Sequence, residues 1–147
     1  MSVRTVSERD DGTALIEFIW LGLLLLVPLV YLMVAASGVQ RAAYGVSAAS
    51  RAAGRAFVLA PDVSVARERA ERAARTALSD QGITADVADV DIECIPICLA
   101  PGSTVTVVVS VRQELPLAPD VLGGAAPAVT VDSTHVEPYG TFREDRS

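Results

Sequence analysis

An acidic side chain lies inside the most hydrophobic stretch of the 147-residue chain, and its position is the one best suited to chemistry. Glu17 is the only charged residue between Asp11 and Arg41. A carboxylate is unfavourable by about a few kcal/mol at the centre of a bilayer, and by less near the interface. At headgroup level Glu17 would simply be hydrated. Deeper in lipid, it would need a cation to neutralise it.

Cleavage of the chain after Gly12 would supply that cation. Thr13 would become the first residue and Glu17 the fifth. The new terminal amine of one subunit would then neutralise the Glu17 carboxylate of a neighbour within lipid, which turns a costly charge into an assembly-specific ion pair. On this hypothesis, Glu17 is a subunit-contact residue.

The only two thiols of the chain are those of Cys94 and Cys98. Two cysteines cannot complete a four-ligand zinc site unless two chains combine. Their spacing around Pro96 favours a disulfide over free thiols if this part of the chain is exported to an oxidising exterior. We therefore predict a disulfide here, and no metal site.

The remaining polar residues do not indicate an enzyme. Asp132 and His135 are close in sequence, but two strand residues three apart point to opposite faces. Asp89, Asp91 and Glu93 place three carboxylates on one strand face, where a weak cation site is less favoured than a solvated polar face. The sequence contains no phosphate loop, nucleophile elbow or acid–base pair. We expect no catalytic residue and no cofactor.

The composition argues against nucleic acid as a partner and indicates a membrane anchor. All 12 basic residues are arginine, the net charge is −6 and the pI is about 4.7, so we expect no nucleic-acid binding. Apolar residues make up 51% of the chain and the mean hydropathy is +0.41. This apolar excess is concentrated near the N-terminus, which indicates a membrane anchor attached to a small domain.

The anchor is predicted over residues 18–40, which are 23 residues without a charge. As a helix they would extend about 34 Å at roughly 1.5 Å per residue. This length matches a hydrocarbon core of about 30 Å, so membrane lipid is an expected partner. Pro28 lies inside the stretch, where a membrane helix tolerates it.

Residues 39–58 are predicted to continue this helix beyond the membrane. Gly45, Ala49 and Ala53 recur every four residues, a spacing that permits close contact between helices. We therefore predict that these three residues contact a partner helix in another subunit.

The remaining pattern predicts a small α+β head. Residues 64–80 form an amphipathic helix, which Asp62 or Ser64 caps and Gly82 ends. Apolar residues then alternate with polar ones over residues 88–94, 104–111 and 129–136, which predicts three antiparallel strands packed on the second helix. An irregular stretch is expected over residues 115–127 because it is rich in proline and glycine.

One family shares several of these features. Gly12, Glu17 and Phe18, followed by a leucine-rich helix, resemble the G-x-x-x-x-E-[FY] processing site of type IV prepilins. The match is closest to the TadE-like minor pseudopilins of the tight-adherence (Flp) pilus system. Similarities to these chains are also found in three later segments, at residues 48–56, 98–103 and 135–139.

The resemblance implies a pilin-like α+β fold and a structural role in pilus assembly. It implies processing between Gly12 and Thr13 by a prepilin peptidase, with Glu17 and Phe18 as part of the recognised site. Expected partners are that peptidase, other pilins or pseudopilins and the pilus assembly platform. The chain would comprise a leader (1–12), a membrane helix with its extension (13–58) and an exported head with an irregular C-terminal tail (59–147).

The orientation of the chain in the membrane and the site at which it is cleaved both have alternatives. Arginines at positions 41, 51 and 55, against positions 4 and 9, slightly favour the opposite orientation, whereas the cysteines favour an extracytoplasmic C-terminal head on a single-pass cell-membrane protein. The small residues 34–38 would also suit signal peptidase. Cleavage near Ser37 would release a secreted binding domain, and a single-pass binding domain unrelated to pili is the related alternative.

Overall fold

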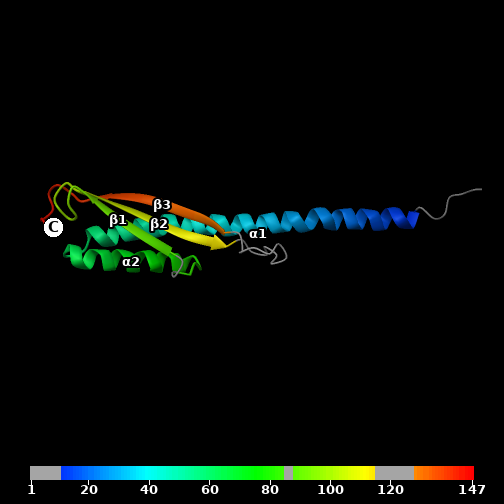
Figure 1. The fold of residues 1–147 in the computed structure, drawn as a ribbon, viewed down its shortest axis with the longest axis horizontal. Coiled ribbons are helices and arrows are strands. Elements are labelled where there is room, and N and C mark those ends of the chain that lie inside the picture. The colour runs from blue at the N-terminus through cyan, green and yellow to red at the C-terminus, as the bar shows by residue number, and fades with distance from the viewer. Residues whose placement is uncertain (1–10, 85–87, 115–127) are drawn as a thin grey trace, which may run out of the picture. The chain divides into compact units, whose positions relative to one another are not determined.

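The computed structural model describes residues 11–84, 88–114 and 128–147, with side chains from residue 14 onward. It contains two helices, α1 (Asp11–Val58) and α2 (Val63–Asp80), followed by three strands, β1 (Ala88–Ile95), β2 (Thr104–Glu114) and β3 (Ala128–Pro138) (Figure 1). This confirms the predicted α+β class, with a long apolar helix, a second helix and a three-stranded antiparallel sheet. The chain divides into two compact units between Ala36 and Ser37, and each is described separately.

The first unit contains the N-terminal part of α1. The helix continues through Pro28, and its leucines are exposed to the surroundings. An 18-residue window within Ala14–Val58 has a mean hydropathy of 2.6 and no buried residue. Among the described residues this is the one helix long and apolar enough to span a membrane, and it therefore fits a single-pass anchor.

The second helix begins and ends where its sequence predicts. A carboxylate oxygen of Asp62 accepts a hydrogen bond from the backbone N–H of Val65 at 3.0 Å, which satisfies one of the unpaired donors at the helix N-terminus. At the other end Gly82 adopts a φ of 69°, a left-handed conformation that glycine adopts without a steric penalty. One side of α2 is buried, and it consists of Ala66, Ala70, Ala74 and Leu78.

The three strands form an antiparallel sheet in the order β1-β2-β3. Ile92 of β1 and His135 of β3 both pair with Val107 of the central strand. Along β2 every second side chain is buried, namely those of Val105, Val107, Val109 and Val111. Period-two alternation therefore places a valine face on the core, as the sequence indicates. Residues 115–127 lie outside the described residues.

The core of the second unit is formed by the sheet, α2 and the C-terminal half of α1, which lie in two layers (Figure 1). The sequence pattern predicted that the strands pack on the second helix, and it placed residues 39–58 of α1 against another subunit. Instead, α1 contributes a continuous buried face of Ala42, Val46, Ala49, Ala53 and Phe57. The helix and the sheet approach closely at Gly54, where a Cβ atom would lie 3.2 Å from Cδ2 of His135 and 3.3 Å from Cβ of Glu137.

The C-terminal residues bind the end of α1. Arg143 Nη1 donates a hydrogen bond to the carbonyl oxygen of Val58 at 3.0 Å, and Arg146 Nη1 donates one to that of Ala60 at 3.1 Å. Carbonyls at a helix C-terminus lack intrahelical donors, so these guanidinium groups satisfy them. Tyr139 is buried, and its backbone N–H donates to the carbonyl of Ser103. The tail is irregular but is held in place by these contacts.

Candidate functional site in the first helix

Glu17 lies on α1 among exposed apolar side chains. Those beside it in sequence include Leu15, Ile16 and Phe18, all with more than half of their surface exposed. Glu17 is also exposed, and it forms no hydrogen bond or ion pair within the part of the chain that the structure describes. Its carboxylate is therefore not engaged by any described side chain or backbone group.

The predicted cleavage site is at the very start of the same helix. Since α1 begins at Asp11, the bond between Gly12 and Thr13 lies in its first turn, while the side chain of Thr13 is outside the described set. The first backbone N–H groups of a helix have no intrahelical acceptor, and helix ends fray. The bond is thus in the part of α1 that is least restrained by hydrogen bonds of the helix itself.

The surroundings of Glu17 determine what it can do chemically. An apolar helix without partners offers no donor to a carboxylate, and lipid offers none either. An amine brought by a second subunit would neutralise it, and this contact would form only when the two helices are in register. The arrangement therefore suits a role in assembly.

The predicted disulfide is confirmed. Cys94, near the end of β1, is joined to Cys98 across four residues, and the two Cα atoms are 5.0 Å apart. The loop between them exposes Ile95 and Ile97. Because both cysteines are paired, no free thiol is present in the chain.

The small-residue face of α1 requires a correction. Gly45, Ala49 and Ala53 were predicted to contact another subunit, but they face the core of their own chain. Ala49 and Ala53 are fully buried, and a Cβ atom at Gly45 would lie within 4 Å of side chains on α2 and the segment that follows it. The spacing correctly indicated close packing, but the partners are the chain's own α2 and sheet.

The polar residues of the sheet divide between its two faces, as predicted. Asp132 is exposed, whereas His135 lies on the opposite face against α1, so the two side chains do not meet. Asp89, Asp91 and Glu93 are exposed on the outer face. Within the described ranges, no group of three or more histidine, cysteine, aspartate or glutamate residues is arranged to hold a metal ion.

A polar column between α1 and β3 was missed by sequence reasoning. His135 Nε2 lies 3.0 Å from Glu137 Oε2, and the hydroxyl of Ser50 lies 3.4 Å from that of Ser133. Along β3 both alternating sets of side chains include polar residues. The period-two pattern therefore does not show which set faces the core. Val131 could have identified the inward set. It packs against the core, and Ser133 and His135, two and four residues further along the strand, point to the same face.

Comparison of the chain with protein-family models, with curated proteins and with solved structures found no match. The α+β fold and the long apolar helix place the chain in a class of proteins that is defined by architecture alone. The chain has one long apolar helix fit for a single-pass anchor, and a small α+β unit with a disulfide.

Proposed function

We propose that this chain is a membrane-anchored minor pseudopilin that acts in assembling a Tad/Flp-type pilus or a related envelope secretion machine. The role is structural rather than catalytic. Processing after Gly12 produces a mature chain that begins at Thr13 and assembles through its N-terminal helix. The setting is a bacterial cell membrane, with the C-terminal head on the extracytoplasmic side.

One observation carries this proposal. Glu17 is an exposed carboxylate without a partner among the described residues, and it is the only charged residue of the helix between Asp11 and Arg41. A charge retained in such a segment is unfavourable in lipid, so an ionisable residue there is by default a candidate for a functional role. Its position five residues after Gly12 supplies a specific partner, which is the terminal amine of a processed neighbour.

The partners follow from this mechanism. Membrane lipid surrounds the anchor, a prepilin peptidase removes residues 1–12, and other pilins or pseudopilins pack beside the helix on the assembly platform. The disulfide between Cys94 and Cys98 supports an extracytoplasmic head, because disulfides persist in oxidising compartments. The net charge of −6 supports a role that involves no nucleic acid.

The processing step is tested by the N-terminus of the native protein. We expect intact-mass measurement and N-terminal sequencing of protein from its own host to give a chain that starts at Thr13. Deletion of the host's prepilin peptidase should leave the start at Met1 or Ser2. A native protein that begins at Met1 or Ser2 while the peptidase is present would contradict the processing step and leave only membrane anchoring.

The pairing step is tested by Glu17→Val. We expect this variant to insert into the membrane normally, since the change removes an unfavourable charge, but to be lost from the assembled machine. Leu21→Val, one helical turn further on, is the matched control and should assemble normally. The readout is recovery of the variant in purified assemblies against its amount in total membranes. Unchanged incorporation of Glu17→Val would reject the ion pair.

A second candidate function is favoured by the boundary between the two units. The second unit begins at Ser37, within the small residues 34–38 where signal peptidase would cut. Its core begins only at Ala42, so such cleavage would leave the core of the head complete. The product would be a secreted binding domain, and its native N-terminus near Gly38 would distinguish it from a pseudopilin.

A further inference from the structure

The outward side of α1 in the second unit carries arginines that have no acidic neighbour on the helix. Positions 41, 44, 48, 51 and 55 follow one another by three or four residues, so they lie on one side of the helix, within an arc of about 80° at roughly 3.6 residues per turn. The side chains at all five positions are exposed. We call this set the arginine stripe, and it consists of Arg41, Tyr44, Ala48, Arg51 and Arg55.

The positive charge of the arginine stripe is not offset by the described residues around it. The helix has no acidic residue after Glu17. None of the three arginines forms an ion pair with a described residue. Glu137 lines the same surface hollow as Arg55, but its carboxylate lies 3.0 Å from Nε2 of His135, and Arg143 also lines the hollow. The stripe therefore presents three guanidinium groups without a carboxylate partner.

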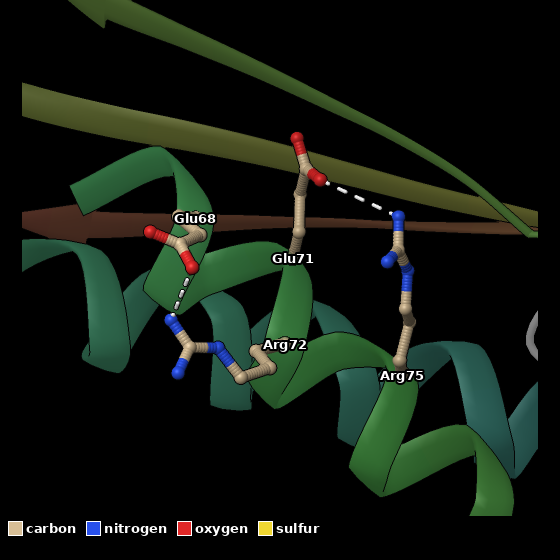
Figure 2. A network of polar contacts seen from close by, with 4 residues as sticks. All are labelled: Glu68, Glu71, Arg72 and Arg75. Carbon is tan, nitrogen blue, oxygen red and sulfur yellow. Dashed lines mark hydrogen bonds and ion pairs between the residues drawn. The ribbon is translucent and has the colours of Figure 1, made fainter. Parts of the chain in front are cut away.

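The second helix is different, because its charges cancel. Its four arginines are matched by four acidic residues, namely Asp62 at the N-cap, Glu68, Glu71 and Asp80. Arg72 pairs with Glu68 at 2.8 Å and Arg75 with Glu71 at 3.4 Å, one turn apart along the helix (Figure 2). The charge of α2 is thus neutralised within the helix and its cap, and α2 offers no surface of one sign.

The outer face of the sheet has an excess of negative charge. Four carboxylates are exposed on the face opposite the valine core, and we call them the acidic sheet face: Asp89, Asp91, Glu93 and Asp132. None of them forms an ion pair with a described residue. Arg112 is exposed on the same face, but Glu114, two residues further along β2, offsets its charge.

These two surfaces cannot meet within one copy of the chain. The arginine stripe is on the side of α1 opposite its buried residues, among them Ala49 and Ala53, and the acidic sheet face is opposite the buried Val107 and Val109. The buried sides of α1 and of the sheet meet in one core (Figure 1). Because the core separates the two surfaces, contact between them requires a second copy.

We propose that the arginine stripe of α1 docks on the acidic sheet face of a second copy of this chain. Charge complementarity selects this occupant, because α1 leaves positive charge unbalanced and the sheet leaves negative charge unbalanced, while the charges of α2 cancel. Ala48 lies in the middle of the stripe and lets the sheet approach the helix between the arginines. The contact joins unlike surfaces and does not close on itself, so repetition adds copies in one direction.

This inference deepens the proposed function by naming a partner of the head, and it rests on that function for the setting in which copies meet. Cysteine cross-linking of the full chain in membranes tests it, since both native cysteines are held in their disulfide. Ala48→Cys and Ser110→Cys retain every charge, and Ser110 pairs with both Asp89 and Asp132 in the sheet. Co-expressed chains that carry these changes and different tags should form a mixed dimer with a short bismaleimide.

Two controls define the geometry of the contact. Thr76→Cys is exposed on α2, outside both surfaces, and should cross-link to Ser110→Cys several-fold less than Ala48→Cys does. Ala48→Cys alone should not cross-link to itself, because the contact joins unlike surfaces. Equal cross-linking of Thr76→Cys, or efficient self-cross-linking of Ala48→Cys, would overturn the proposal.

Charge reversal tests the cause of the contact. Adding Arg51→Glu and Arg55→Glu to the Ala48→Cys chain should reduce the mixed dimer several-fold. Adding Asp89→Arg and Asp132→Arg to the Ser110→Cys chain should then restore it, and failure to restore it would reject the charge pairing. Raising the salt to about 1 M, where charges are screened beyond roughly 3 Å, should also reduce the yield.

Anionic lipid is the other class of partner that exposed arginines attract, and the same assay separates it. The mixed dimer should form equally in vesicles of phosphatidylcholine and in vesicles that also contain phosphatidylglycerol. A dimer that requires phosphatidylglycerol would assign the stripe to lipid headgroups and overturn the proposal. If the mixed dimer is absent in both while the native N-terminus is Thr13 and Glu17→Val is lost from assemblies, the docking proposal fails and the proposed function stands.

Discussion

Two stretches of the same helix use apolar residues in opposite ways. Over residues 14–36 the large side chains are exposed, with 62% of the Leu25 surface accessible. Over residues 42–57 one face of mostly small side chains is buried, and Ala49 and Ala53 on that face have no accessible surface. No described residue covers the leucines of the first stretch, whereas the second packs on α2 and the sheet through alanine, glycine and valine.

The difference shows what each stretch requires of its surroundings. A continuous band of exposed leucines is far larger than the apolar patches that soluble monomers tolerate, and it requires lipid or other helices. The alanine-rich stretch instead lets backbones approach closely, so its stabilisation comes from dense contact among small groups. Four sets of substitutions test this comparison, in decreasing order of expected effect.

The largest effect is expected at Phe57, the largest apolar side chain that α1 buries in the core. Phe57→Ala should lower the free energy of unfolding of the head by about 3–5 kcal/mol, because it removes buried contacts and leaves a cavity. Phe142→Ala is the control, since Phe142 is fully exposed. Thermal unfolding of the full chain in detergent gives both values, and equal losses would contradict the assigned core.

The exposed leucines can be compared between the two units. Leu25 and Leu59 have nearly equal exposure, at 62% and 63%. Leu25→Arg should oppose membrane insertion by about 2.5–3.5 kcal/mol if this stretch is in the bilayer centre. Leu59→Arg should insert normally, because Leu59 follows α1 in the second unit. A glycosylation-based insertion assay measures both, and normal insertion of Leu25→Arg would place residues 14–36 outside the bilayer.

The glycines provide a smaller and more local comparison. A Cβ atom at Gly22 meets no atom within 4 Å, whereas one at Gly54 meets His135 and Glu137. Gly54→Leu should destabilise the head by about 1–3 kcal/mol through overpacking. Gly22→Leu should leave head stability unchanged. Denaturant unfolding monitored by circular dichroism measures this contrast, which would disappear if α1 and β3 were not closely packed.

The smallest effect is a pH dependence at the start of α2. The hydroxyl of Ser64 and the backbone N–H of Val65 donate hydrogen bonds that lower the pKa of Asp62 below its ordinary value of 3.8. A lowered folded-state pKa contributes stability above the ordinary value, and this contribution is lost as the pH falls through the folded-state pKa.

Acid titration of head stability tests the role of Asp62. Asp62→Asn retains a good N-cap but does not titrate, so the loss of stability below about pH 4 should become smaller. Asp62→Ala should lower stability at neutral pH as well. If Asp62→Asn leaves the acid profile unchanged, the cap makes no contribution that depends on its charge.

Much of the fold could be predicted because its helices and strands are specified by local sequence patterns. A 23-residue uncharged stretch, a cap at Asp62 and strict alternation around Val107 each specify an element from its own residues. The disulfide was predictable because only two cysteines exist. Glu17 could be singled out because a lone charge in an apolar stretch is visible without any structure.

Long-range contacts were not predictable in the same way. Arg143 and Arg146 bind carbonyls about 85 residues earlier in the chain, and nothing local to either partner indicates this pairing. The polar column of β3 was missed for the same reason, since Ser133 and His135 acquire their surroundings from α1.

The amino-acid sequence by itself determined the long apolar helix, the order and type of the elements, and the position of the one carboxylate inside the apolar stretch, because each depends on composition or on a short period. Only the tertiary structure decided that Gly45, Ala49 and Ala53 face their own chain, because a small-residue stripe specifies close packing without specifying its partner. Which element covers a buried stripe depends on how layers pack, and no local pattern contains that information.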